Sequence, residues 1–121
     1  MHEGSIDLAA LRRLLDVIGG DAGDFAELVD DYAAGAPELV AKIRDAASSM
    51  DWESVFRAAH TLKSNAKDFG AHRLAALCAN LETAARQGRV EQPETLISEV
   101  ESEEVTARQA LQNISVNDLP D

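Results

Sequence analysis

Residues 51–88 read DWESVFRAAHTLKSNAKDFGAHRLAALCANLETAARQG. Apolar residues recur every three or four positions on both sides of Gly70, which predicts two amphipathic helices joined by a short turn. Asp51 is a favoured N-cap for the first helix, and Gly70 is placed to end it. The second helix is expected over about 72–87. This stretch therefore predicts a helical hairpin.

Three further helices are expected outside the hairpin. The spacing of apolar residues predicts them over about 7–18, about 21–50 and about 93–113. Pro37 lies inside the second of these ranges, where a proline kinks or interrupts a helix. The pattern therefore allows either one long helix or two. The last residues, about 115–121, are expected to form a frayed tail.

The composition agrees with a helical domain of modest size. The chain has 121 residues, of which 45% are hydrophobic and only 4% aromatic. A single core commonly organises a chain of this length, so we expect one domain over residues 1–121. Each expected helix has one apolar stripe and short connections. We predict an all-α fold, an antiparallel four-helix bundle with an additional short N-terminal helix.

Charge and cysteine content exclude several classes of function. The formal net charge is -11, which argues against nucleic acid or an anionic membrane surface as the main partner. The sequence has one cysteine, no apparent signal peptide and no apolar run long enough to span a membrane, so we expect a cytoplasmic protein. The charge is uneven, however: residues 51–89 carry a net charge of +2. This segment is the first place to look for an anion site.

His60 lies on the flank of the first hairpin helix, outside its apolar stripe. Lys63, Ser64 and Lys67 follow at i+3, i+4 and i+7, so they line the same flank. Such a helix displays an imidazole with two ammonium groups and a small hydroxyl around it. A surface histidine among lysines is also an ordinary solvated face, so this spacing alone does not establish a function.

Glu82 occupies the matching flank of the second hairpin helix. His60 is 10 positions before Gly70 and Glu82 is 12 after it, so antiparallel packing would bring them together at the helix seam. A carboxylate that accepts from one imidazole N–H leaves the other nitrogen free as a nucleophile. Nearby lysines would stabilise an incoming phosphoryl group. Alternatively, Glu82 pairs with Arg86 at i+4 on its own helix.

The residues of this hairpin match a known family. The run HTLKSNA at 60–66, followed by Phe69-Gly70-Ala71 and by Cys78, Leu81 and Glu82, resembles the histidine phosphotransfer (HPt) domain of bacterial multistep phosphorelays. The motif covers about 23 residues without a gap, and the helix pattern extends the resemblance over nearly the whole chain. We therefore expect a protein that shuttles a phosphoryl group between receiver-domain aspartates and a histidine.

The resemblance implies a role for each residue on the two flanks. His60 would be phosphorylated at Nε2, with Lys63 beside the phosphoryl group and Glu82 holding the other ring nitrogen. Lys67 would make a secondary electrostatic contact. Ser64 stands where the family most often has glycine, at the point where a receiver domain approaches.

The resemblance also implies partners and the source of any cofactor. The expected partners are response regulator receiver domains and a hybrid sensor histidine kinase, with magnesium bound by the receiver and no cofactor or metal in this chain. The sequence has no Gly-rich nucleotide loop, so phosphorylation from ATP is not expected. We expect a monomer. The alternative is a non-catalytic helical module that binds receiver domains or partner helices without carrying phosphate.

Overall fold

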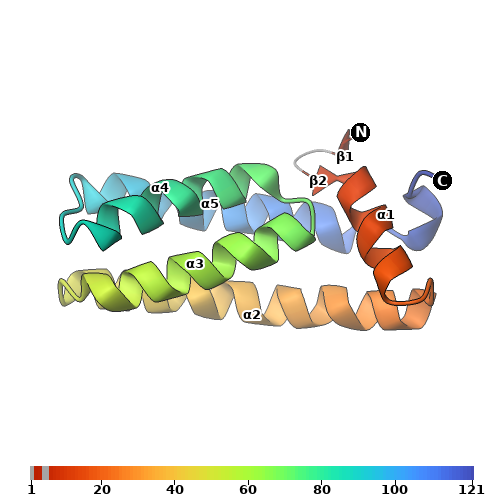
Figure 1. The fold of residues 1–121 in the computed structure, drawn as a ribbon, viewed down its shortest axis with the longest axis horizontal. Helices are drawn as coiled ribbons and strands as arrows, with labels where there is room; N and C mark the ends of the chain where they lie inside the picture. Colours follow the sequence, from red (N-terminus) through yellow and green to blue (C-terminus); the bar gives the residue numbers. More distant parts are fainter. Residues whose placement is uncertain (1, 4–5) are drawn as a thin grey trace.

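Helices form nearly all of the described chain (Figure 1). The structure is a computed structural model that describes residues 2–3 and 6–121. Its helices are α1 (Leu8–Val17), α2 (Ala22–Ser48), α3 (Trp52–Asp68), α4 (His72–Arg86), α5 (Pro93–Gln112) and the 3-10 helix η1 (Val116–Asp118). The predicted all-α class is confirmed, and each predicted helix starts or ends within a few residues of its expected bounds.

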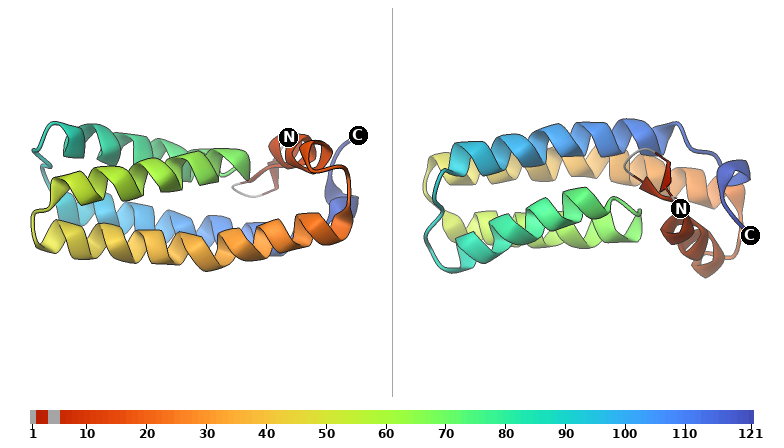
Figure 2. Two further views of the ribbon diagram at one scale, coloured as in Figure 1. Left: turned by 60° about the horizontal axis from the view of Figure 1, so that its bottom comes forward. Right: turned by 90° about the horizontal axis from the view of Figure 1, so that it is seen from above.

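The four longer helices form an antiparallel bundle (Figure 2). α3 packs against α2 and α4, and α5 packs against the same two helices from the other side. α3 and α4 are shorter than α2, so the turn that connects them does not reach the N-terminal end of α2 (Figure 1). The short helix α1 occupies the space left there, as predicted, and both chain termini lie at this end (Figures 1 and 2).

The turn between α3 and α4 is attached to the N-terminal segment. Here β2 (Ile6–Asp7) pairs antiparallel with β1 (His2–Glu3), two-residue strands that the sequence pattern did not predict. The Asp7 N–H donates to the Gly70 carbonyl at 2.9 Å. Gly70 has a φ of +75°, and a Cβ there would lie 2.5 Å from the Asp7 carbonyl oxygen. Glycine is therefore required both by the backbone conformation and by the close approach of the two segments.

The second predicted helix is continuous through Pro37. α2 begins after Asp21, whose side chain accepts from the Asp24 N–H at 2.9 Å. The buried side of the helix continues on both sides of the proline, with Ala36 and Val40 each less than a tenth exposed. Packing of this uninterrupted apolar face outweighs the backbone hydrogen bond that proline cannot donate.

The last residues, where a frayed tail is expected over about 115–121, begin with the 3-10 helix η1. The side chain of Ser115 and that of Asp118 each bond to the other residue's backbone N–H, which caps η1. Ile114 and Leu119 on either side of η1 are both buried in the core. These contacts anchor residues 114–119, and fraying of the tail over about 115–121 stays a prediction.

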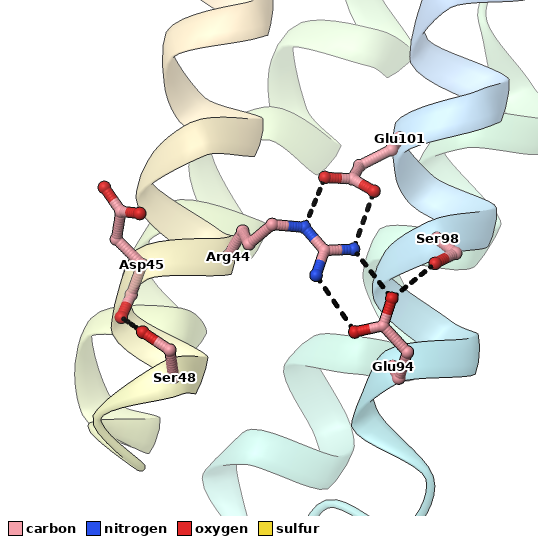
Figure 3. A network of polar contacts seen from close by, with 6 residues as sticks. All are labelled: Arg44, Asp45, Ser48, Glu94, Ser98 and Glu101. Carbon is pink, nitrogen blue, oxygen red and sulfur yellow. Dashed lines mark hydrogen bonds and ion pairs between the residues drawn. The ribbon is translucent and has the colours of Figure 1, made fainter.

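A polar network joins α2 to α5 near the opposite end of the bundle (Figure 3). The Arg44 guanidinium donates to both oxygens of Glu101, from Nε at 2.6 Å and from Nη2 at 2.7 Å. It also donates to Glu94, whose carboxylate accepts from the Ser98 hydroxyl as well. Arg44 therefore connects two helices that are far apart in the sequence.

Candidate functional site

His60 projects from the outer flank of α3. The helix begins at the predicted cap, where the Asp51 side chain accepts from the Ser54 N–H at 3.2 Å. The predicted stripe of α3 is fully buried, and its members are Val55, Ala59, Leu62 and Ala66. With that face turned to the core, the side chain of His60 is 56% exposed. Its position on an accessible flank is confirmed.

Glu82 meets His60 across the seam between α3 and α4. Nδ1 of His60 is hydrogen-bonded to Oε1 of Glu82. The Glu82 side chain is only 9% exposed, so this carboxylate lies beneath the imidazole. A carboxylate can only accept, so the ring nitrogen that faces it carries the proton. The other nitrogen, Nε2, is then left with a free lone pair.

Lys63 also contacts Glu82. Its ammonium donates to Oε2 of Glu82 at 2.6 Å, so the two carboxylate oxygens are used by two different side chains. Burial raises the pKa of Glu82, but the hydrogen bonds from Lys63 and His60 lower it more and hold it below its usual value. Glu82 is therefore ionised at neutral pH, and an ionised carboxylate accepts the hydrogen bond that Nδ1 of His60 donates.

Arg86 does not pair with Glu82, which was the alternative interpretation of the sequence. Within the described part of the chain it forms no ion pair with Glu82; its guanidinium carbon lies 4.9 Å from the centroid of the Phe56 ring. Phe56 in turn is stacked on His60, with ring centroids 6.1 Å apart and an interplanar angle of 16°. Phe56 is not among the site residues predicted from the sequence, although its i–4 spacing from His60 is a usable signal.

Comparison with known proteins identifies the family of this chain. A family model described as the Hpt domain matches residues 27–115. The chain belongs to the Hpt domain family. It is thus a histidine phosphotransfer domain of the phosphorelay type, a class that works with hybrid kinases and receiver domains. No curated protein matches the sequence closely enough to be reported as a relative.

Two solved structures share the fold of this Hpt domain. Histidine-containing phosphotransfer protein B (HptB) from Pseudomonas aeruginosa PAO1 superposes with a TM-score of 0.83 at 24% identity, covering 92% of this chain and 94% of that one. The HPT domain of a sensor hybrid histidine kinase from Shewanella superposes with a TM-score of 0.70 at 24% identity, covering 95% of this chain and 100% of that one. Both similarities extend over almost the entire bundle.

Ser64 and Lys67 lie further along the same flank of the Hpt domain. Both are exposed, and among the described residues neither side chain makes a hydrogen bond or ion pair. The structure therefore brings His60, Lys63 and Glu82 into direct contact and leaves these two side chains open to solvent.

The remaining nucleophilic and titratable groups of the Hpt domain have other environments. Cys78 is fully buried, and burial raises the pKa of its thiol to about 12, so it packs in the core in the neutral form. Within residues 2–3 and 6–121, no three His, Cys, Asp or Glu side chains are grouped so that they could hold a metal ion. In the same part of the chain, none of the helices has the length and apolar character needed to cross a membrane.

Proposed function

We propose that His60 is the phosphorylated residue of this Hpt domain and reacts through Nε2. The observation that carries the proposal is the bond between Nδ1 and the buried Glu82 carboxylate, made by an imidazole that is otherwise exposed. Glu82 selects the tautomer in which Nε2 is the nucleophile. Exposure is needed because the phosphoryl donor is itself a folded protein.

The proposed reaction is an in-line displacement at phosphorus. The Nε2 lone pair of His60 attacks the phosphorus of a receiver-domain aspartyl phosphate. The N–P bond forms while the bond from phosphorus to the aspartate oxygen breaks, and aspartate leaves as a carboxylate. Nδ1 keeps its proton, so the ring gains a positive charge that the Glu82 carboxylate offsets. The reverse sequence delivers the phosphoryl group to a second receiver.

The lysines have different proposed roles. Lys63 is bound to Glu82, so its first role is to keep that carboxylate ionised, and it lies one turn from His60 to attract the phosphoryl oxygens. Lys67 is exposed one turn further along and contributes a longer-range attraction. Ser64, also exposed, provides a small surface at which a receiver domain fits closely.

The proposed partners are the receiver domain of a response regulator and a hybrid sensor histidine kinase, acting with this chain as a cytoplasmic monomer. Magnesium, when bound by the receiver, would stabilise charge on the transferring phosphoryl group. Everything that this chain contributes is a nucleophile, its orientation and a local positive charge. It turns over only with its partners.

His72 offers a matched control for the test of this proposal. Wild type, His60→Gln and His72→Gln are incubated with a radiolabelled phosphoreceiver, and label that is acid-labile and base-stable is counted. His72 is also largely exposed, with a side chain 49% accessible, but it lies on a different part of the bundle. We expect label on wild type and His72→Gln and none on His60→Gln. Label retained by His60→Gln would overturn the assignment, and an unlabelled wild type that still binds the receiver would support the non-catalytic alternative.

A further inference from the structure

α3 and α4 place two pairs of side chains at successive levels of their seam. At one level His60 contacts Glu82. One turn away, at i–4 on α3 and i+4 on α4, the Arg86 guanidinium lies over the Phe56 ring. The stacking of Phe56 on His60 connects the two levels into one arrangement.

The bond to Glu82 does not by itself define the direction of the nucleophilic lone pair. A hydrogen bond at Nδ1 restrains that atom, whereas the exposed remainder of the ring can still tilt about it and move Nε2. The Phe56 ring lies nearly parallel to the imidazole, at an interplanar angle of 16° and with the ring centroids 6.1 Å apart. This aromatic contact restrains the tilt that the hydrogen bond leaves free.

Arg86 forms no ion pair with Glu82 among the described residues. The two oxygens of that carboxylate accept instead from His60 and Lys63. The Arg86 guanidinium lies within the distance range of a cation–π contact with Phe56. Phe56 is half-buried, so part of its ring is accessible to this contact.

We propose that Phe56 is a positioning residue that orients the His60 imidazole for in-line transfer, and that Arg86 acts through Phe56. This inference rests on the proposed function, since it assumes that Nε2 of His60 is the reacting atom. In-line displacement depends on the direction of the attacking lone pair, and small misplacements of a reacting group slow such steps strongly.

The test compares Phe56→Leu with Trp52→Leu. Trp52 lines the same shallow hollow beside α4 as Phe56 does, but it makes no stacking contact with His60 among the described residues. Transfer from a phosphoreceiver is measured over a range of receiver concentrations. We expect Phe56→Leu to lower the rate at saturating receiver about fivefold with little change in the half-saturating concentration, because orientation and not docking is lost. Trp52→Leu should leave the saturating rate unchanged.

A second measurement needs neither phosphate nor partner. The order parameter of the His60 Cε1–H bond, from carbon-13 relaxation of the free protein, reports how far the ring moves. We expect it to fall in Phe56→Leu and to stay at the wild-type value in Trp52→Leu. An unchanged order parameter and an unchanged saturating rate in a folded Phe56→Leu would overturn the proposal. Because this readout does not depend on phosphorylation, it separates failure of this inference from failure of His60 as the phosphorylated residue.

Arg86 is tested by a double-mutant comparison. Arg86→Gln alone should slow transfer about twofold, and it should have no further effect in the Phe56→Leu background if it acts through Phe56. An equal additional slowing in that background would show that Arg86 acts on the phosphoryl group or the partner directly, which would overturn the second half of the proposal.

Discussion

Glu82 is the residue on which the chemistry of the site depends most directly. It is nearly buried, it accepts from the Lys63 ammonium and from Nδ1 of His60, and it determines which imidazole nitrogen is free. A carboxylate in that position is favourable only when it is paired, because an unpaired buried charge is costly. The same pairing therefore explains both why the carboxylate can be buried and why it is ionised.

Replacing Glu82 with alanine should slow transfer and leave the bundle folded. The change removes the group that orients His60 and no part of the apolar core, so we expect transfer to slow about tenfold, or about 1.4 kcal/mol in the barrier. Glu82→Gln retains an oxygen for the Nδ1 proton and should lie between wild type and Glu82→Ala. Transfer kinetics and the circular-dichroism melt are the measurements. Equal rates for wild type and Glu82→Ala would remove Glu82 from the mechanism.

Replacing Lys63 with methionine should raise the pKa of Glu82. Burial raises that pKa, and the bond from Lys63 is the largest opposing effect, so its loss leaves burial less opposed. The wild-type pKa is lowered by folding, so the stability contributed by ionised Glu82 is present above its usual pKa and lost as the pH falls through the lowered value. In Lys63→Met that loss should begin at a higher pH.

The measurement is the carbon-13 titration of the Glu82 carboxyl. Lys67→Met is the matched control, because Lys67 lies on the same flank and makes no contact with Glu82 among the described residues. If both variants shift the titration equally, the effect comes from the general positive charge of the flank. Lys63→Met should also shorten the lifetime of the phosphohistidine or slow transfer.

Among the helices, two glycines should respond to alanine in opposite directions. Gly35 lies inside α2, and a Cβ there would meet no atom within 4 Å, so Gly35→Ala should stabilise the protein by about 0.5–1 kcal/mol. Gly70 ends α3 at a φ of +75°, with a Cβ 2.5 Å from the Asp7 carbonyl oxygen. Gly70→Ala should therefore destabilise by about 2 kcal/mol or more.

Urea unfolding of the two alanine variants measures both effects. Equal effects of the two substitutions would mean that the contact of the α3–α4 turn with the N-terminal segment is not maintained in solution.

The connection between α2 and α5 should depend more on Glu101 than on Glu94. Both carboxylates have a lowered pKa because they accept hydrogen bonds from Arg44, but the Glu101 side chain is 35% exposed and that of Glu94 is 77% exposed. Solvent screens the more exposed pair more strongly. Glu101→Gln should therefore lower the urea midpoint more than Glu94→Gln, and the difference should shrink in high salt. A larger effect for Glu94→Gln would contradict this ranking.

At the scale of the whole molecule, Asp7 connects segments that are 65 residues apart. Its side chain caps α1 through the Ala9 N–H and accepts from Nε2 of His72 at 2.8 Å, while its backbone N–H bonds to Gly70. The hydrogen bond from His72 is the main reason that the pKa of Asp7 is lowered. The N-terminal segment is thus held against the α3–α4 turn by both backbone and side-chain contacts.

Because of the charge on Asp7, the free energy of unfolding should depend on pH. Because the pKa of Asp7 is lowered by folding, its contribution is complete above the usual aspartate pKa and is lost as the pH falls through the lowered value. We expect Asp7→Asn to be less stable than wild type at neutral pH and the two proteins to converge in strong acid. Urea midpoints between about pH 2 and pH 7 provide the measurement. A difference that is independent of pH would show that the charge of Asp7 plays no part.

The folded structure places the uneven charge of the sequence on different parts of the molecule. Residues outside 51–89 carry a net charge of -13, whereas residues 51–89, which form α3, α4 and the turn between them, carry +2. Folding places the lysines of this segment on one flank beside His60. An acidic molecule therefore presents a locally basic surface at the proposed site of transfer.

The helices, and the face of the helix on which each proposed site residue lies, follow from local patterns in the sequence. Capping by Asp21 and Asp51 and the 3.6-residue period are local, so they can be read without knowledge of the fold. Antiparallel register about Gly70 was enough to bring His60 and Glu82 to one seam. Even the resemblance to the Hpt family depends on residues within one hairpin.

Which partner each side chain takes depends on the packing of the helices. By spacing, Glu82 had His60 and Arg86 as candidate partners. The packing of α3 against α4 instead gave its two oxygens to His60 and Lys63 and placed Arg86 on Phe56. The continuity of α2 through Pro37 likewise depends on apolar burial against other helices. Which contact forms depends on the difference in free energy between competing contacts. These free energies depend on distances between elements, and a local sequence pattern does not contain those distances.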